Sequence, residues 1–142
     1  MKIGIASDHR GVILKEKIKN YLNDRYQIID YGTNSIESVD YPLYAYKIGE
    51  SVRDNKIDLG ILICGTGIGM SIACNKVKKV RCAKVTTKEE AFLARSHNNA
   101  NVIALSENTN NYKEIIDTFI DTTFSNDEKH RRRVEMIDNY GN

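Results

Sequence analysis

Apolar and polar positions alternate along the chain between two kinds of segment. Short apolar runs, typical of strands, are followed by longer segments in which apolar residues recur every three or four positions, as in amphipathic helices. The run LGILIC at 59–64 has no polar alternation, which is typical of a strand covered on both faces. We predict strands over residues 2–6, 27–31, 59–64, 81–86 and 101–105, and helices over residues 11–23, 41–55, 69–77, 88–96, 111–123 and 127–140.

The order of these elements predicts the fold class. Strands that alternate with helices are joined by right-handed crossovers, which give a mostly parallel sheet with helices on both faces. We expect an α/β fold, a three-layer αβα sandwich with a Rossmann-like five-stranded parallel sheet and an extra C-terminal helix. The 142 residues, 41% of them hydrophobic and without repeats or low-complexity linkers, suit one domain over residues 1–142.

Charge and the N-terminal segment restrict the classes of partner. The chain has 21 Lys and Arg against 19 Asp and Glu, and its net charge of +2 is too small to predict nucleic-acid or membrane-surface binding. Met1-Lys2 leads directly into an apolar strand, without the apolar core of a signal peptide, and no later run has the length of a membrane span. We therefore expect a cytoplasmic protein with no nucleic-acid or membrane partner.

The three cysteines differ in their expected roles. Their odd number and the absence of CxxC spacing predict neither a disulfide framework nor a structural zinc site. Cys74 and Cys82 lie inside a predicted helix and a predicted strand, where cysteine usually serves as a small buried apolar residue. Cys64 ends a strand and faces a glycine-rich turn at the start of a helix, where a thiolate is favoured. Cys64 is therefore a candidate base or nucleophile.

Polar residues gather where the predicted strands end. Asp8 and His9 follow the first strand, Asp40 and Tyr41 come after the second, and Cys64 ends the third. Ligands of open α/β sheets bind at the carboxyl ends of the strands, so these residues predict a site at that edge. Strand ends favour polar and glycine residues in any protein, which explains each cluster singly but their joint occurrence less well.

The glycine-rich loop CGTGIG, residues 64–69, predicts a tight turn whose amides converge on an anion. A dinucleotide site would have G-x-G-x-x-G in the first βαβ unit and an acidic residue after the next strand, whereas this loop has G-x-G-x-G and that strand ends in VTT. A C-x5-R phosphatase would need arginine at Met70, and a receiver domain would need aspartate at Cys64. The remaining interpretation is an anion-holding turn beside an activated thiol, with amides suited to a developing oxyanion.

Two further candidate groups lie outside this loop. His97 follows the fourth predicted helix and, if it lies near the carboxyl edge, could face Cys64 and transfer protons near neutral pH; a polar connector explains it nearly as well. Lys129 and Arg133 are one turn apart on the last predicted helix. They form either a solvated face or a phosphate clamp.

Taken together, these residues resemble the ribose-5-phosphate isomerase B family, which also includes the galactose-6-phosphate isomerase subunits. The similar segments are residues 7–11 (SDHRG), 30–33 (DYGT), 38–42 (SVDYP), 60–75 (GILICGTGIGMSIACN), 95–102 (RSHNNANV) and 130–137 (HRRRVEMI). The resemblance implies an aldose-ketose isomerase of the pentose phosphate pathway. It would interconvert D-ribose 5-phosphate and D-ribulose 5-phosphate through a cis-enediolate, with no metal and no cofactor.

The resemblance also implies roles for individual residues. Cys64 would be the base that moves a proton between C2 and C1, and His97 the acid that assists opening of the sugar ring. The enediolate oxygen would be held by Thr66 and the loop amides of Gly65, Gly67, Ile68 and Gly69, and the hydroxyls and phosphate would be bound by Asp8, His9, Tyr41, Asn98, Lys129 and Arg133. The implied partners are the phosphorylated sugar and further copies of the chain, in a homodimer or homotetramer whose active sites are shared between subunits.

The chain departs from the family pattern at the expected phosphate site. The resemblance implies an arginine after the fifth strand, where Asn108 stands, and an arginine at the position of Lys129. Our hypothesis is that Arg10, Arg131 or Arg132 partly replaces the missing arginine. The alternative functions are a galactose-6-phosphate or allose-6-phosphate isomerase and, from another class, a non-catalytic sugar-phosphate-binding module; the presence of both Cys64 and His97 favours the pentose enzyme.

Overall fold

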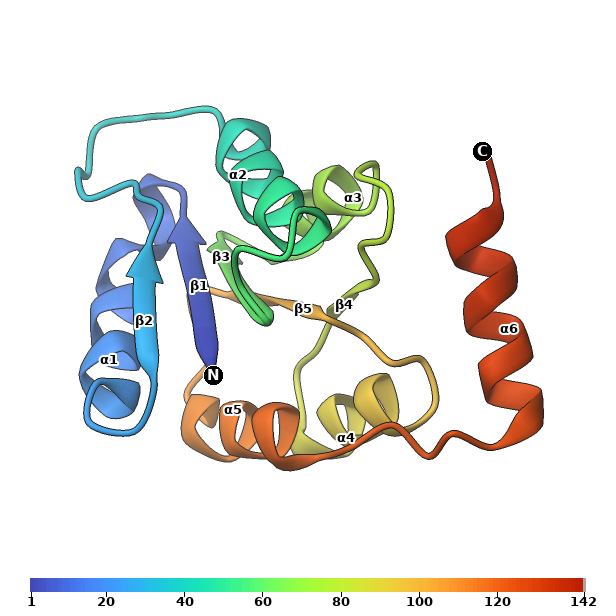
Figure 1. Cartoon of the computed structure of the whole chain (residues 1–142). Coiled ribbons are helices and arrows are strands. Elements are labelled where there is room, and N and C mark those ends of the chain that lie inside the picture. Colours follow the sequence, from blue (N-terminus) through green and yellow to red (C-terminus); the bar gives the residue numbers. More distant parts are fainter. Residues whose placement is uncertain (142) are drawn as a thin grey trace.

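The structure, a computed structural model, describes residues 1–141 and contains a five-stranded parallel sheet flanked by helices (Figure 1). The strands are β1 (Lys2–Ser7), β2 (Gln27–Asp30), β3 (Leu59–Cys64), β4 (Cys82–Lys84) and β5 (Val102–Ser106), in the spatial order β2-β1-β3-β5-β4. The helices are the 3₁₀ helix η1 (His9–Gly11) and α1 (Val12–Leu22), α2 (Tyr41–Arg53), α3 (Ile68–Cys74), α4 (Lys88–Ser96), α5 (Tyr112–Asp121) and α6 (Glu128–Asn139). The predicted fold class is confirmed.

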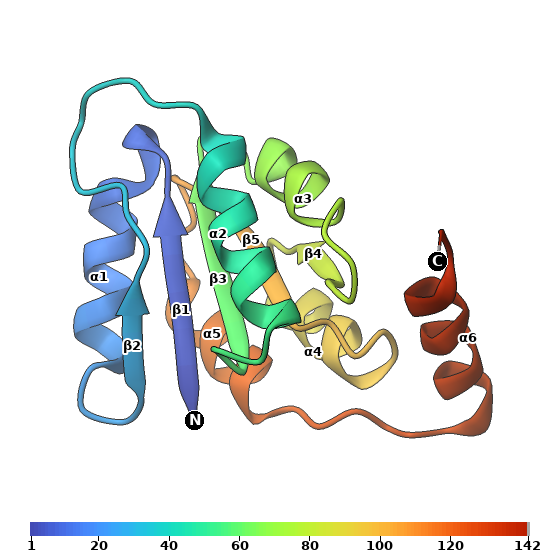
Figure 2. The same cartoon turned by 45° about the horizontal axis from the view of Figure 1, so that its top comes forward.

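Different helices cover the two faces of the sheet (Figure 2). One core packs α1, α4 and α5 against the sheet, and the other packs α2 and α3 against the opposite face. Because side chains alternate along a strand, Ile61 and Ile63 of β3 belong to the first core, whereas Leu62 and Cys64 belong to the second. The LGILIC segment is therefore buried on both faces, as its sequence predicts.

α3 and β4 are both shorter than predicted, and one side chain links the end of α3 to the start of β4. Asn75 follows the last residue of α3, and its amide group bonds both backbone groups of Cys82, with Cys82 N–H donating to Oδ1 at 2.7 Å and Nδ2 donating to the Cys82 carbonyl at 2.9 Å. These two bonds occupy the side of β4 that has no neighbouring strand. Asn75, the C-cap residue of α3, therefore also completes the open edge of the sheet at the start of β4.

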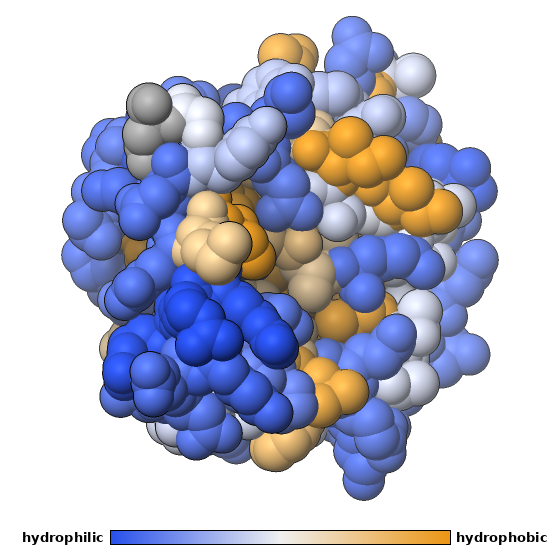
Figure 3. Space-filling view, turned by 90° about the vertical axis from the view of Figure 1, so that its right-hand side faces the viewer, coloured by the Kyte–Doolittle hydropathy of each residue, from blue (hydrophilic) through white to orange (hydrophobic). Residues whose placement is uncertain are grey.

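The C-terminal helix α6 lies beyond β4, beside the sheet rather than over one of its faces (Figures 1 and 2). It is held by the buried side chain of Val134 and by an ion pair in which Arg81 Nη1 lies 2.7 Å from Asp138 Oδ1. Met136 and Ile137 of α6 remain exposed, and this side of the molecule shows apolar areas next to a strongly hydrophilic one (Figure 3). Within residues 1–141, no helix combines the length and apolar character needed to cross a bilayer.

Candidate active site

The carboxyl edge of the sheet brings together three segments that are far apart in the sequence. β1 and β5 flank β3, so the residues that follow them lie on either side of the loop after β3. Asp8 N–H donates to the Ile63 carbonyl at 3.2 Å, and Glu107 N–H donates to the Cys64 carbonyl at 2.9 Å. The chain leaves β1 toward α1 on one face and β3 toward α3 on the other, and ligands of α/β sheets bind at such switch points.

Cys64 begins the glycine-rich loop as a buried free thiol. Its Sγ accepts a hydrogen bond from the amide of Gly67 at 3.1 Å. Gly67 has φ = +82°, in the left-handed region, and a Cβ there would lie 3.0 Å from the backbone carbon of Leu105. Glycine is therefore required for a turn that holds the sulfur against a backbone donor.

Two side chains hold the rest of the loop. Thr66 Oγ1 accepts from the Ile68 amide at 3.1 Å, and the Ser106 hydroxyl donates to the Gly65 carbonyl at 3.0 Å. The amides of Gly67 and Ile68, predicted as donors to the substrate, are thus engaged within the loop. The next amide, that of Gly69, lies in the first turn of α3, where N–H groups have no acceptor within the helix.

Tyr41 and Asp8 lie next to this loop in different ways. The Tyr41 ring packs against Gly69, where a Cβ would come within 2.6 Å of ring atom Cζ and 2.8 Å of the hydroxyl oxygen. Asp8 is buried, and its Oδ1 accepts from the amides of Arg10 and Gly11 at 3.0 and 3.2 Å. Asp8 therefore caps η1, the turn that carries His9.

His9 is oriented by the loop over residues 31–40. Its Nδ1 accepts from the amide of Val39 at 3.2 Å. A neutral imidazole that accepts at Nδ1 carries its proton on Nε2. His9 therefore presents an Nε2–H donor at the carboxyl edge.

The buried side chain of Lys15 holds the same loop through hydrogen bonds from inside the protein. Nζ of Lys15, a fully buried residue of α1, lies 2.8 and 2.9 Å from the two carboxylate oxygens of Asp30, 2.6 Å from the Thr33 carbonyl and 2.7 Å from Asn34 Oδ1. Burial raises the pKa of the Asp30 carboxyl, but hydrogen bonds from Lys15, Lys19 and the Gly32 amide outweigh burial and lower that pKa overall. The loop that orients His9 therefore rests on a charged network inside the protein.

His97 lies at the opposite edge of the sheet from Cys64. Helix α4 begins after β4 at the carboxyl edge and returns to the start of β5, so its C-cap residue, His97, lies toward the amino edge. There the ring of His97 stacks on that of His130 from α6, with 4.3 Å between centroids and 14° between planes. The expectation that His97 faces Cys64 within one chain is wrong, because a helix that connects parallel strands must end at the edge opposite its start.

The predicted site residues thus fall into two groups. The carboxyl-edge group comprises Asp8, His9, Tyr41, Cys64, Gly65, Thr66, Gly67, Ile68 and Gly69, and the α6 group comprises His97, Asn98, Lys129 and Arg133. Partial desolvation and the neighbouring basic side chains of His97, Lys129 and Arg133 lower the pKa of His130, whose ring stacks on that of His97. One chain therefore does not unite the two groups.

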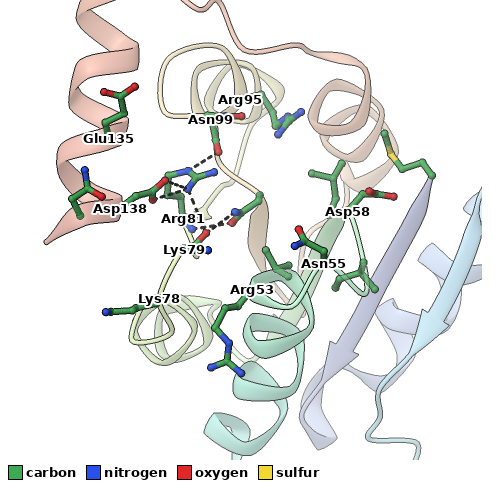
Figure 4. Close-up of a pocket in the computed structure, with 16 residues that line it drawn as sticks. Arg53, Asn55, Asp58, Lys78, Lys79, Arg81, Arg95, Asn99, Glu135 and Asp138 are labelled. Atoms are coloured by element: carbon green, nitrogen blue, oxygen red, sulfur yellow. Dashed lines mark hydrogen bonds and ion pairs between the residues drawn. The ribbon is translucent and has the colours of Figure 1, made fainter. Parts of the chain in front are cut away.

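A cavity of about 700 Å³ lies at the amino edge, between α6 and the starts of β1, β3 and β5 (Figure 4). Arg81 crosses it, donating from Nε to the Asn99 carbonyl at 2.9 Å and from Nη1 to the Asp138 carboxylate. Arg95 at its wall donates to the carbonyls of Ala100 and Thr122. None of the predicted site residues lines this cavity, so the cavity does not mark the position of the candidate active site.

The other two cysteines are buried, as predicted. A hydrogen bond with Cys74, together with burial, raises the pKa of Cys82 well above its usual value. Within residues 1–141, no group of three or more His, Cys, Asp or Glu side chains is placed to hold a metal ion.

One contact at the carboxyl edge was not predicted from the sequence. Arg10 forms two hydrogen bonds with Glu107, which is 97 positions away. The sequence alone points to Arg10 as a candidate but not to Glu107. A usable signal was present, since both residues come just after strands, but pairing them required the knowledge that β1 and β5 both flank β3.

Comparisons with known proteins agree with this architecture. Residues 3–137 match the sequence pattern of the family described as ribose/galactose isomerase. Ribose-5-phosphate isomerase B of Escherichia coli (strain K12) is 39% identical over 140 residues, which cover 96% of this chain and 93% of that protein. A crystal structure of ribose 5-phosphate isomerase from Thermotoga maritima superposes with a TM-score of 0.92 at 48% identity, covering 96% of this chain and 97% of the other.

A second crystal structure adds a ligand to the comparison. Ribose-5-phosphate isomerase B from Mycoplasma genitalium, solved with bound ribulose 5-phosphate, superposes with a TM-score of 0.92 at 41% identity and covers 98% of this chain and 95% of the other. The sequence and the fold of this chain thus match those of ribose-5-phosphate isomerase B proteins over nearly its whole length. The chain belongs to the ribose/galactose isomerase family.

Proposed function

We propose that this chain interconverts D-ribose 5-phosphate and D-ribulose 5-phosphate through a cis-enediolate. The observation that carries the proposal is the buried thiol of Cys64, held by the Gly67 amide at the switch point of the sheet. The family membership supports it, since the Escherichia coli relative at 39% identity is a ribose-5-phosphate isomerase B.

The reaction moves one proton between C2 and C1 of the open-chain sugar, which requires a base and donors to the oxygen that becomes charged. Cys64 is the proposed base. Thr66 and the amides of Gly65 and Gly69 are the proposed donors to the enediolate oxygen, since the amides of Gly67 and Ile68 bond within the loop. Tyr41 and Asp8 are proposed to bind sugar hydroxyls beside the loop, and His9 to donate its Nε2–H to the phosphate.

The α6 group is proposed to act in the site of a second copy of the chain. In this arrangement His97 of one subunit assists ring opening, Asn98 binds a hydroxyl, and Lys129 and Arg133 bind the phosphate next to the Cys64 of its neighbour. Support comes from the separation of the two groups within one chain. Exposed apolar side chains on α3 and α6 add to it, because such surfaces mark sites of association: Ile68, Ile72, Met136 and Ile137.

The proposal includes a homodimer or homotetramer and a place in the pentose phosphate pathway of the cytoplasm. Both sugar phosphates are intermediates of that pathway. Their charged phosphate groups are costly to transfer into hydrocarbon, so the enzyme must share their compartment.

The decisive experiment is a kinetic comparison of ribose 5-phosphate, allose 6-phosphate and galactose 6-phosphate with the purified full chain. We expect the highest kcat/KM with ribose 5-phosphate. A preference for a six-carbon sugar would favour the alternative isomerases of the family, and binding without turnover of any of them would identify a non-catalytic module.

Mixing two inactive variants tests the shared site. Cys64→Ser and His97→Asn should each be inactive alone, whereas mixed oligomers contain sites with both native residues and should regain activity. Absence of any regained activity in mixed oligomers would contradict the shared arrangement.

A further inference from the structure

We propose that Arg10, held in place by Glu107, is an additional residue of this chain that binds the substrate phosphate. The inference deepens the proposed function and rests on it for the identity of the anion. It is carried by the geometry of the Arg10–Glu107 pair over the glycine-rich loop.

The pair leaves one edge of the guanidinium available. Arg10 Nε lies 2.7 Å from Glu107 Oε2, and Nη2 lies 3.1 Å from Oε1. These bonds occupy the Nε–H and one of the Nη2 hydrogens. The opposite edge, formed by Nη1 and the second Nη2 hydrogen, retains the donor geometry that matches a phosphate bidentately.

The guanidinium lies directly on the loop that Cys64 begins. A Cβ on Gly65 would lie 3.3 Å from both Cζ and Nη1 of Arg10. Glycine at position 65 therefore leaves room for the guanidinium. The hydrogen bond and charge of Glu107 are the main causes that raise the pKa of Arg10, and the charges of Asp8 and Cys64 add to them.

Both members of the pair are tied to the backbone of the site. The Arg10 amide bonds Oδ1 of Asp8 at 3.0 Å, and the Glu107 amide bonds the Cys64 carbonyl at 2.9 Å. His9, in the same turn as Arg10, presents its Nε2–H at this edge. The Arg10–Glu107 pair is thus anchored by backbone bonds on both sides of β3.

The position of Arg10 distinguishes phosphate binding from a role at the reacting carbons. Cys64 is buried, whereas 59% of the Arg10 side chain is exposed. C1 and C2 of the sugar must contact the thiol, and the phosphate lies at the other end of the molecule. A cation at the outer side of the loop therefore faces the phosphate end.

The test compares Arg10→Ala with a matched control. Arg53 forms the same kind of two-bond pair with Asp54, at 2.9 and 3.2 Å, but at the amino edge. We expect Arg10→Ala to raise KM for ribose 5-phosphate by about ten- to hundredfold, as for loss of a charged hydrogen bond, with kcat little changed. Arg53→Ala should leave both constants unchanged.

Two further measurements make the outcome unambiguous. The dissociation constant of inorganic phosphate, followed by NMR shifts of the loop amides, should rise in Arg10→Ala by a similar factor whether or not the wild type isomerises ribose 5-phosphate. The double variant Arg10→Ala/Glu107→Ala should recover part of the lost affinity, because Arg10→Ala alone leaves an uncompensated carboxylate facing the phosphate.

The proposal is overturned if KM and phosphate affinity do not change in Arg10→Ala. It is also overturned if kcat falls while KM stays constant, since that result would place Arg10 at the enediolate. A wild type that binds phosphate through Arg10 but does not turn over ribose 5-phosphate would instead contradict the proposed function alone.

Discussion

At the carboxyl edge of the sheet, three segments bond to one another's backbones around a buried thiol, whereas at the amino edge a charged cavity of about 700 Å³ separates α6 from the strand starts. The cavity is therefore at one edge of the sheet and the candidate base, Cys64, at the other. In the amino-edge cavity the guanidinium of Arg81 is occupied by protein acceptors, which is the pattern of a structural contact. At the carboxyl edge, by contrast, no protein acceptor among residues 1–141 engages the His9 Nε2–H or the outer edge of Arg10.

Backbone-held donors, rather than the cavity, therefore mark the candidate site, and in the proposed shared arrangement one chain supplies only part of it. The residues that a second copy would add, His97, Lys129 and Arg133, lie with α6. The comparison between the edges can be tested by changing each in turn.

The largest effect is expected for Cys64→Ser. A hydroxyl is a far weaker base than a thiolate, and loss of a general base lowers kcat by about 10²- to 10⁴-fold. The variant should fold normally, as checked by circular dichroism. Lys78→Ala at the amino-edge cavity should retain full turnover, and near-normal turnover of Cys64→Ser would remove the proposed base.

Removal of the buried lysine should weaken the carboxyl edge from inside. Lys15→Met leaves the Asp30 carboxylate without its buried partner and should lower the free energy of unfolding in urea by about 3–5 kcal/mol. Lys19 contacts the same carboxylate at 2.8 Å but is more exposed, so Lys19→Met should cost about 1 kcal/mol or less. Equal losses in the two variants would show that burial of Lys15 is unimportant.

A glycine at each edge offers a further contrast. Gly67→Ala forces a left-handed alanine against Leu105 and should cost about 1–2 kcal/mol of stability together with much of the activity. Gly60→Ala, at the amino end of β3, places a Cβ 2.5 Å from Ile48 Cγ2. It should cost about 1–3 kcal/mol through overpacking but leave the kinetics of the folded enzyme unchanged. Unfolding curves measure the stability of the two variants, and turnover at 25 °C measures their activity. Equal losses of activity in Gly67→Ala and Gly60→Ala would contradict the expected difference between the two edges.

The smallest effect concerns pH at the α6 group. Because the pKa of His130 is below its ordinary value of 6.5 in the folded state, the unfolded state binds this proton more readily. The stability linked to His130 is therefore present above pH 6.5 and is lost as the pH falls through the folded pKa. NMR titration should show the pKa of His130 rising in His97→Gln, and His130→Gln should lose less stability than the wild type on acidification; no change in either would exclude the coupling.

Local features of the site could be predicted because they depend on local chemistry. Gly67 at a left-handed turn and Cys64 at the end of a strand buried on both faces follow from residue type and periodicity in a few consecutive positions. Asn75 shows the limit, since it caps α3 and bonds the backbone of Cys82 although the apolar period continues to residue 77. Hydrogen bonds between a side chain and a backbone segment elsewhere in the fold are not visible in the apolar periodicity of the sequence.

The sequence alone predicts the alternation of strands and helices, the glycine-rich loop and the family resemblance, because each depends on consecutive residues. The three-dimensional arrangement was needed to show that β1 and β5 flank β3, that Arg10 bonds Glu107 beside Gly65, and that His97 stacks on His130 away from Cys64. Strand order and helix direction come from the packing of whole elements, and that packing depends on contacts between residues that are distant in the sequence.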